Sequence, residues 1–481
     1  MTWATVRRRL LQGSVAAGGL AMLGGDGVFG GEGALAAAGE APARSSSARR
    51  LEPLAAACRD LYIYGLAALE MARARDRTMG GRTNEFRHVR VLASARSRRV
   101  TTPNNDTLYS SAWLDLRTGP IEIAIPATGQ RYFSLALLDM HSNNFHIVGT
   151  RATGGHAHRF RLLPPDGSPG PGEVRAPTWW GWAQARTLAS GDSDLAAAHA
   201  LQDALELMPS RAGPQSSLGL TPPPPVTAAE IQQLAAIAAL LETAAPPATP
   251  DIDFLQRLRK RGLTAGALAA AAQTALPDDR LVVASVAGVA AARREIAGVL
   301  EHPVVIDGWL YSRPTLGDFG TDYLYRAAVA VWGLAALPPI EAVYVRAVGP
   351  ISGALFDGTG SWRIRFPPGR LPPVGAFWSL SLYEALPSGE LFFFDNPLRR
   401  YAIGDRTSGL EFAADGSLEI RISADDPGTA TGTATGTATG TIGRGNWLPC
   451  PRAPFALILR AYLPGPAFVD GSYRLPAVEH L

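Results

Sequence analysis

The chain has 481 residues, of which 47% are hydrophobic and 18% are charged, and its formal net charge at pH 7 is +3. A chain of this length predicts two to three globular domains, because one hydrophobic core rarely serves so many residues. The nearly balanced charge gives no electrostatic reason to expect nucleic acid as a partner. The two cysteines, Cys58 and Cys450, exclude a disulfide-rich scaffold and leave open either one bridge or two buried thiols.

Residues 1–38 resemble an export signal. Three arginines, Arg7 to Arg9, precede an apolar, glycine-rich run that ends near Leu23, and alanines around Ala36 offer a small-residue cleavage site. Paired arginines followed by leucines are typical of a twin-arginine signal, whereas an ordinary secretory signal or a retained anchor is the alternative. We therefore expect a periplasmic or secreted protein that has no membrane span once the signal is removed.

The remainder of the chain predicts an α+β fold that is mainly β, with two β domains joined by helices. Apolar residues alternate with other residues at 121–125 and 131–138, which is the period-two pattern of half-buried strands. The predicted segments are a linker at 39–50, an N-terminal β domain with packing helices at 51–208, a Pro-rich linker at 209–226, a helical segment at 227–340, and a C-terminal β domain at 341–481 with a disordered Thr-Ala-Gly loop at 429–441.

Two of the predicted strands resemble each other. Residues 132–139 read YFSLALLD and residues 377–384 read FWSLSLYE, and each stretch follows a strand that ends in a proline, Pro126 or Pro367. This correspondence predicts an internally duplicated β unit. A chance match is the alternative, because strands draw on few residue types.

A polar cluster is predicted around the turn at Pro103, where asparagine and aspartate side chains bond to their own backbone. In the functional interpretation, Asp106 or Asp139 acts as acid or base, the amides orient a ligand, and Arg151 holds an anion. The catalytic residues are then Asp106, Tyr109 and Arg151. In the alternative, Asp106 pairs with Arg151 inside a buried network. The whole cluster contains Asn104, Asn105, Asp106, Tyr109, Asp139, Asn143, Asn144 and Arg151.

A second polar cluster is predicted in the C-terminal domain. Arg460 and Tyr462 lie on one face of their predicted strand, opposite Leu457 and Leu459. Such a pair suits a carboxylate-bearing or aromatic ligand. The alternative is a salt-bridged sheet face that locks the two domains together. The other candidate ligand-binding residues of this cluster are Arg400, Tyr401, Asn446 and Trp447, with Asn396, Arg399 and Arg406 beside them.

Other kinds of site receive less support from the sequence. Standard catalytic signatures such as Gly-x-Ser-x-Gly, His-Glu-x-x-His, the phosphate loop and Cys-x-x-Cys are absent from it. Four histidines between residues 141 and 158 match no standard metal-ligand spacing, so neither a metal nor another cofactor is expected. The tryptophans at 179, 180 and 182 leave open a stacking platform for carbohydrate.

Several motifs carry a resemblance to a known pair of domains. PNNDTLYSSAWLDL at 103–116, RYFSLALLDM at 131–140 and VGTRATGG at 148–155 resemble the bacterial family known as domain of unknown function 1254. NPLRRYAIGDRT at 396–407 and FALILRAYLPGP at 455–466 resemble its usual C-terminal companion, domain of unknown function 1214. The resemblance implies exported proteins built from two β-sandwich, jelly-roll-like domains joined by helices, and it implies no settled activity.

These observations favour an exported protein that binds or processes a small organic molecule in a pocket near the domain interface. If the protein is an enzyme, metal-independent hydrolysis is the expected reaction. The alternative is a non-catalytic binding or structural protein of the cell envelope, in which the same residues are scaffold. The sequence leaves the oligomeric state open.

Overall fold

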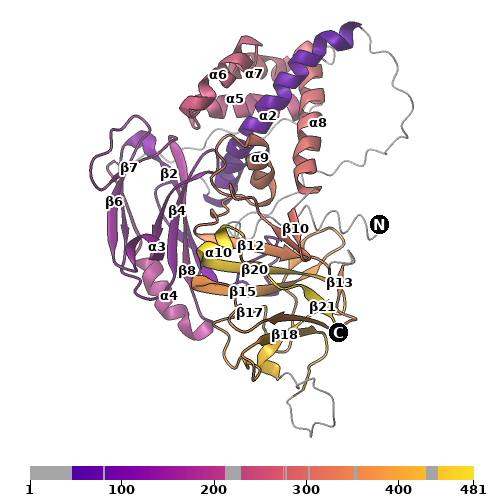
Figure 1. Cartoon of the computed structure of the whole chain (residues 1–481). Coiled ribbons are helices and arrows are strands. Elements are labelled where there is room, and N and C mark those ends of the chain that lie inside the picture. Colours follow the sequence, from indigo (N-terminus) through magenta and orange to yellow (C-terminus); the bar gives the residue numbers. More distant parts are fainter. Residues whose placement is uncertain are drawn as a thin grey trace.

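The computed structural model describes residues 46–79, 82–211, 229–274, 276, 279–301, 304–350, 355–428 and 443–481. Two β-rich domains lie side by side, and a bundle of helices lies at one end of them (Figure 1). This arrangement confirms the expected α+β fold with two strand-rich domains. The expected export signal, nearly all of the Pro-rich linker and the Thr-Ala-Gly loop lie outside the described residues. Each helix within the described ranges is too short or too polar to cross a bilayer.

The N-terminal β domain consists of two sheets packed face to face. Alternate residues fill the core between them, such as Leu135 and Leu137 from one sheet and Ile121 and Ile123 from the other, as the alternation predicts. The larger sheet has the strand order β1 (Arg87–His88), β2 (Thr107–Asp115), β8 (Trp180–Leu188), β4 (Phe133–Asp139) and β5 (Asn144–Gly149), and the smaller sheet has the order β7 (Glu173–Arg175), β6 (His158–Leu163), β3 (Ile121–Ile125) and β9 (Glu206–Pro209).

The C-terminal β domain repeats this construction. Leu380 and Leu382 of its larger sheet pack against Ile364 and Ile420 of its smaller sheet. The larger sheet has the order β10 (Val304–Ile306), β11 (Trp309–Tyr311), β12 (Ala342–Ala347), β20 (Pro454–Pro464), β15 (Val374–Ala385) and β16 (Leu391–Phe392), with β13 (Phe356–Asp357) beside β20 and β17 (Ala402–Gly404) beside β15, and the smaller sheet has the order β19 (Trp447–Pro449), β18 (Leu418–Ser423), β14 (Trp362–Phe366) and β21 (Val478–His480).

Strands β10 and β11 lie inside the segment 227–340, which the sequence pattern predicts to be helical. The two strands form a hairpin across Asp307 and Gly308, whose φ angles are 50° and 83°. Asp-Gly is a preferred pair for such a two-residue turn, because both positions require a positive φ. The C-terminal sheet therefore begins before residue 341.

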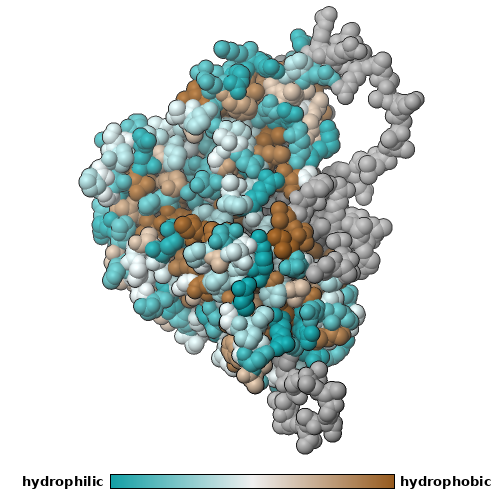
Figure 2. Space-filling model, in the orientation of Figure 1, coloured by the Kyte–Doolittle hydropathy of each residue, from teal (hydrophilic) through white to brown (hydrophobic). Residues whose placement is uncertain are grey.

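The helices form a bundle in which α2 is the central element. Gly65 of α2 lies against Ile237 of α5, and Gly288 of α8 lies against Cys58 of α2. Figure 2 shows many hydrophilic residues at the outer end of this bundle. Most of its large apolar residues are buried, whereas Ile252, Val283 and Val286 are exposed. The bundle comprises α2 (Ser46–Met79), α5 (Ala229–Thr243), α6 (Ile252–Lys260), α7 (Ala265–Thr274), α8 (Arg280–Glu301) and α9 (Tyr323–Trp332), and the short helices elsewhere are α3 (Thr150–Thr153), α4 (Leu195–Asp203), α10 (Pro466–Val469), η1 (Leu116–Thr118), η2 (Asp192–Asp194), η3 (Thr249–Asp251) and η4 (Arg444–Asn446).

Helix α2 differs from the sequence-based expectation in two ways. It begins at Ser46, inside the segment 39–50 expected to be a linker, because alanine and arginine favour extension of a helix. It also belongs mainly to the bundle, whereas the sequence pattern assigned its residues to the N-terminal β domain. Cys58 of α2 and Cys450 lie in different cores and are both free, so the disulfide alternative is wrong.

The two β domains share one topology, which confirms the predicted duplicated unit. The strand sequence β2-β8-β4-β5 in one larger sheet corresponds to β12-β20-β15-β17 in the other, and all of these neighbours are antiparallel. In the smaller sheets, β7-β6-β3-β9 corresponds to β19-β18-β14-β21, and in both the first pair is parallel. A chance resemblance of two strands would not produce this agreement.

The registers agree as well as the strand orders. In each larger sheet one row of directly paired residues reads tyrosine, arginine, serine, glycine across four strands. We refer to these as the matching rows. Their members are Tyr109, Arg186, Ser134 and Gly149 in the N-terminal domain, and Tyr344, Arg460, Ser379 and Gly404 in the C-terminal domain.

The matching rows lie on the faces that the two larger sheets turn toward each other. Tyr132 and Phe377 occupy equivalent positions, and their rings meet edge to face with centroids 5.7 Å apart. Contact between two equivalent residues is the mark of an approximate two-fold axis. The duplicated units therefore face each other as the two subunits of a symmetric dimer would.

Candidate functional site

Two ion pairs cross the boundary between the β domains at equivalent positions. Asp106 accepts a hydrogen bond from Arg406 Nη2 at 2.6 Å, and Glu341 accepts one from Arg151 Nε at 2.8 Å. Each carboxylate lies three residues before the tyrosine of its matching row, and each arginine lies two residues after the glycine. The alternative pairing of Asp106 with Arg151 is therefore wrong, because each domain gives its carboxylate to the arginine of the other.

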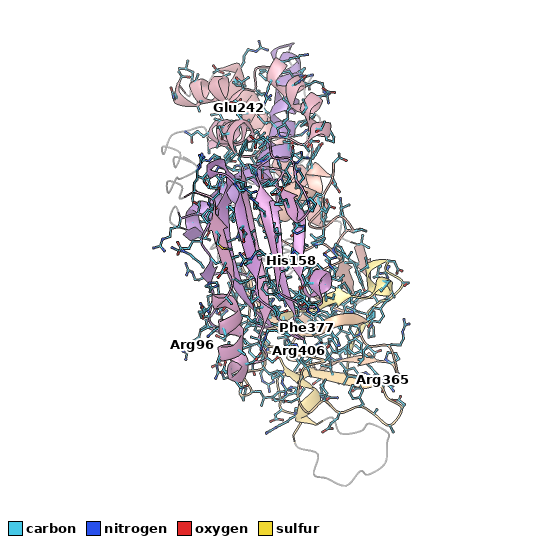
Figure 3. The ribbon with its side chains drawn as sticks, turned by 90° about the vertical axis from the view of Figure 1, so that its left-hand side faces the viewer. Arg96, His158, Glu242, Arg365, Phe377 and Arg406 are labelled. Atoms are coloured by element: carbon cyan, nitrogen blue, oxygen red, sulfur yellow. The ribbon has the colours of Figure 1, made fainter. Side chains whose placement is uncertain are left out.

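Asp106 is buried and uses both of its carboxylate oxygens. Its backbone N–H donates to Asn104 Oδ1 at 2.8 Å, which is the side-chain turn predicted at this position. The oxygen not used by Arg406 accepts a hydrogen bond from Ser379 Oγ at 2.6 Å. The Arg406 guanidinium lies 4.3 Å from the centre of the Phe377 ring, and Figure 3 shows both side chains where the N-terminal sheets meet the C-terminal domain.

The polar turn that contains Thr102 and Asn104 also attaches the N-terminal domain to β20 by hydrogen bonds. Asn104 Nδ2 donates to Tyr462 OH at 2.9 Å, and Arg460 Nη2 donates to the Thr102 carbonyl at 3.1 Å. The two clusters predicted from the sequence therefore meet here, since Asn104 belongs to the first and Arg460 and Tyr462 belong to the second. Hydrogen bonds rather than salt bridges make this part of the contact.

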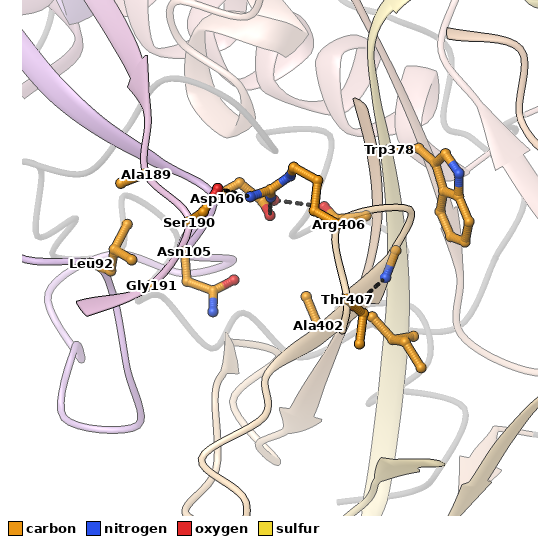
Figure 4. A pocket seen from close by; sticks show the side chains of 13 residues that line it. Leu92, Asn105, Asp106, Ala189, Ser190, Gly191, Trp378, Ala402, Arg406 and Thr407 are labelled. Atoms are coloured by element: carbon orange, nitrogen blue, oxygen red, sulfur yellow. Dashed lines mark hydrogen bonds and ion pairs between the residues drawn. The ribbon is translucent and has the colours of Figure 1, made fainter. Parts of the chain in front are cut away.

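An open recess lies beside Asp106, between the two domains (Figure 4). Its volume is about 210 Å³, which is below the roughly 300–1,000 Å³ of typical ligand pockets. Asn105 Oδ1 is buried and finds no hydrogen-bond partner within the described residues. The polar lining of the recess comes from Asn105, Asp106, Ser190, Ser379, Arg406 and Thr407.

A buried layer of aromatic and basic side chains, which we name the axial layer, lies between the two ion pairs. Contacts run through it from Glu341 to Tyr132 OH at 3.0 Å, from the Tyr132 ring to the Tyr462 ring at 5.1 Å, and from Tyr462 to Asn104. Burial raises the pKa of Tyr344 to about 12, so this phenol is neutral near pH 7. The axial layer consists of Tyr109, Tyr132, Arg186, Tyr344, Arg460 and Tyr462.

The other predicted residues of the first cluster lie at the turn between β4 and β5, away from the recess. Asp139 Oδ1 accepts backbone N–H groups of His141 and Asn143, each at 2.9 Å, and burial raises the pKa of Asp139. Asn144 Nδ2 donates to the Ala336 carbonyl at 2.9 Å. Asp139, Asn143 and Asn144 thus close a turn and attach it to the segments flanking α9.

The remaining predicted residues of the second cluster also satisfy backbone groups. Arg400 Nη1 donates to the Trp447 carbonyl at 2.7 Å. Asn446 Oδ1 accepts the Glu411 N–H at 2.8 Å. Tyr401 is buried in the large apolar core. The second cluster therefore divides, and Arg406, Arg460 and Tyr462 are the members that reach the domain boundary.

The structure also shows where the tryptophans of the suggested carbohydrate platform and the histidines lie. Trp180 and Trp182 are each 1% exposed, so the carbohydrate platform is wrong, because a stacking surface must be accessible. His146 and His158 lie beside Phe160, at 5.2 and 5.8 Å between ring centroids, whereas His141 lies against the Tyr64 ring of the bundle at 5.5 Å. Among the residues that the structure describes, no three metal-ligating side chains gather.

His141 predicts a specific acid sensitivity. Burial, with a smaller effect of Arg326, lowers the pKa of His141 from 6.5 to about 3. The folded protein therefore keeps this ring neutral while the unfolded chain protonates it below pH 6.5, so stability is lost as the pH falls from 6.5 toward 3. At about 1.4 kcal/mol per pH unit, the stability of the wild type should fall by about 2 kcal/mol more than that of His141→Gln between pH 6.5 and 4.5.

Urea denaturation at a series of pH values measures this difference. The comparison with a variant cancels the opposite contribution of Asp139, whose raised pKa favours the folded state as the pH falls. His158→Gln is the control, because His158 is exposed on β6. Equal pH slopes for wild type and His141→Gln would contradict the prediction.

Besides Ser190 and Thr407 of the recess, the sequence analysis does not identify four residues of the domain boundary: Arg186, Ser379, Glu341 and Tyr344. A signal for them exists in the duplication. Once 132–139 is aligned with 377–384, Ser379 matches Ser134, and extending the register outward matches Arg186 to Arg460 and Tyr344 to Tyr109.

Comparison with protein families gives matches to both β domains. Residues 83–209 match the family model described as protein of unknown function DUF1254. Residues 341–466 match the model described as protein of unknown function DUF1214. The two resemblances predicted from the motifs are therefore confirmed. A search of curated proteins found no match.

Two solved structures match most of the chain. The VPA0106 protein from Vibrio parahaemolyticus is 23% identical, the match covers 89% of this chain and 100% of that one, and the TM-score is 0.66. A putative uncharacterized protein from Burkholderia cenocepacia is 10% identical, with 90% and 95% of the two chains covered and a TM-score of 0.41. The first comparison shows a shared fold.

Proposed function

The chain joins a DUF1254 domain to a DUF1214 domain, and we propose that it is an exported protein that binds a small organic molecule in the recess beside Asp106. The observation that carries this proposal is that both domains contribute polar side chains to one open recess. Ligand sites commonly occur where domains meet and combine a few convergent polar groups. Export to the periplasm or the medium rests on the signal-like sequence of residues 1–38.

The lining of the recess favours a small, polar, uncharged ligand. Asp106 and Arg406 neutralise each other, so the recess holds little net charge. The hydroxyls of Ser190, Ser379 and Thr407 both donate and accept hydrogen bonds. The buried Asn105 oxygen has an unused acceptor site. A compound with hydroxyl or amide groups would satisfy these atoms.

If the protein is also an enzyme, the reaction that we propose is metal-independent hydrolysis. Of the predicted catalytic residues, Asp106 lines the recess, whereas Tyr109 belongs to the axial layer and Arg151 lies at Glu341. Ser379 Oγ donates to Asp106, so its proton can pass to that carboxylate as Oγ attacks the carbonyl carbon of an ester. The leaving alcohol would take this proton as its bond to the carbonyl carbon breaks, and water would then cleave the acyl–Ser379 ester. The competing proposal is a non-catalytic binding or structural protein, and it is favoured by the use of both Asp106 oxygens in the domain contact.

Native mass spectrometry of the protein purified from its own host tests the proposal. The wild type should carry an adduct that is lost on denaturation, on a chain shortened near Ala36. Asp106→Asn should lose the adduct, because the amide no longer neutralises Arg406 or accepts from Ser379 in the same way.

Glu341→Gln is the matched control, because it weakens the equivalent ion pair with Arg151, and neither of these two residues lines the recess. It should keep the adduct. Loss of the adduct in both variants would mean that binding depends only on an intact domain contact. A wild-type mass without any adduct would favour the structural role.

A further inference from the structure

We propose that Ser379 accepts the acyl group from esters of short-chain acids, and that Phe377 is the positioning residue that leaves it free to do so. This inference rests on the function proposed for the recess, and it adds the substrate class and the reason why one of two equivalent serines reacts. The duplication places a serine, a carboxylate and an aromatic ring together twice. The two sets are Tyr132, Ser134 and Glu341, and Phe377, Ser379 and Asp106.

In the first set a phenol separates the serine from the carboxylate. Tyr132 OH lies 3.0 Å from Glu341 Oε1 and 3.1 Å from Ser134 Oγ. Burial raises the pKa of Tyr132 well above its usual value, so the phenol stays neutral and donates its proton to Glu341. A neutral phenol is a weak base, and the serine beside it is therefore not activated.

In the second set the serine meets the carboxylate directly. Phe377 occupies the position equivalent to Tyr132 and has no hydroxyl, and Ser379 Oγ donates to Asp106 Oδ2 at 2.6 Å. A serine becomes a nucleophile when an adjacent base can take its proton. The absence of one hydroxyl, at Phe377, thus distinguishes the reactive serine from its equivalent.

The second set is also the one that a substrate can reach. Ser379 and Asp106 line the recess, whereas the three members of the first set are not among its lining residues. The recess has a volume of about 210 Å³ and an apolar side formed by Leu92, Ala189 and Ala402 (Figure 4). This space suits a short apolar acyl chain, and the open mouth leaves the alcohol part of an ester in solvent.

The reaction balances without a further reactant other than water. A bond forms between Ser379 Oγ and the carbonyl carbon of the ester, and the serine proton passes to Asp106. The bond from that carbon to the alcohol oxygen breaks, and the alcohol leaves with the proton. Water then hydrolyses the acyl–serine ester to the short-chain acid and the free serine.

The probe is p-nitrophenyl acetate, and mass spectrometry of the protein and of its peptides is the readout. The wild type should gain one acetyl group on the peptide that contains Ser379 as p-nitrophenol is released. Acetylation of amines gives little background, because Lys260 is the only lysine in the chain. Ser379→Ala should lose this acetyl group, whereas Ser134→Ala, the equivalent substitution outside the recess, should keep it.

Phe377→Tyr tests the positioning role. The new hydroxyl should separate Ser379 from Asp106, as the Tyr132 hydroxyl does in the first set, so the acetylation rate should fall roughly 100-fold, the effect of losing a general base. Phe377→Leu introduces no hydroxyl and should keep most of the rate, although it loses the ring beside Arg406. An equal loss of rate in these two variants would contradict the role of Phe377.

Native mass spectrometry distinguishes failure of this inference from failure of the proposed function. A wild type that carries the native adduct but gains no acetyl group on Ser379 would overturn the inference and leave the binding proposal intact. The inference is also overturned if Ser379→Ala is acetylated as fast as the wild type. Absence of both the adduct and the acetyl group would overturn both proposals. The peptide map of the wild type decides the question even if a variant fails to fold.

Discussion

Gly404→Ala should destabilise the protein by about 3 kcal/mol, which is at the upper end of the cost of overpacking a core. A Cβ atom at Gly404 would lie 2.1 Å from the Trp378 carbonyl oxygen and 3.0 Å from Ser379 Cα. Both contacts are to backbone, so β15 and β17 would have to separate. The free energy of unfolding, measured with urea, gives the size of the effect.

The duplication predicts the same result at Gly149. A Cβ atom there would lie 2.2 Å from the Phe133 carbonyl oxygen and 2.8 Å from Ser134 Cα, and its φ of +150° adds strain for any other residue. Gly149→Ala should therefore cost at least as much as Gly404→Ala. Gly409→Ala is the control, because Gly409 has a φ of +76° but no heavy atom within 4 Å of the added carbon. It should cost about 1 kcal/mol, and a loss at Gly404 no larger than that at Gly409 would contradict the steric argument.

Asn104→Ala should cost about 3 kcal/mol, because one buried side chain holds the turn and joins the domains. Asn104 Oδ1 accepts the Asp106 N–H, and Nδ2 lies within 3.2 Å of the hydroxyls of Thr107, Tyr109 and Tyr462. Each lost hydrogen bond typically removes about 1 kcal/mol. Urea denaturation measures the loss, and proteolysis should become faster at the domain boundary.

The neighbouring residue gives the sharpest control for this variant. Asn105 is only partly buried, and its Oδ1 has no partner among the described residues. Asn105→Ala should therefore change the stability by about 0.5 kcal/mol or less, while it should weaken any ligand that occupies the recess. Equal destabilisation by the two alanine variants would contradict the role assigned to Asn104.

The sequence predicts the positions of the strands better than it predicts which side chains form ion pairs between the domains. Alternation at 121–125 and the repeat of 132–139 in 377–384 are local patterns, and the structure confirms both. The partners of Asp106 and Arg151 could not be found in this way, because Arg406 and Glu341 are 300 and 190 residues distant along the chain. Polarity alone grouped Asp106 with Arg151, although they occupy opposite sides of the axis.

Burial explains most of the other differences between the sequence-based predictions and the structure. Trp182 looked suitable for an exposed aromatic platform, but the Trp113 ring stacks on it at 4.7 Å inside the core. Asn143, Asn144 and Asn446 looked like ligand-binding amides, and each instead forms hydrogen bonds within the protein. A polar residue in a motif is thus as suitable for closing a turn as for binding a ligand, and sequence spacing does not separate the two roles.

The reciprocal ion pairs also bear on how the two halves of the chain can change. In a homodimer with an isologous interface, one substitution alters both symmetry-related positions together. Covalent fusion of the two units removes that constraint, and the flanks of the ion pairs have become different. Asn105 and Thr407 flank Asp106 and Arg406, whereas Ile340 and Ala152 flank Glu341 and Arg151. A single chain can therefore keep polar residues beside one ion pair and apolar residues beside the other, which two identical subunits could not do.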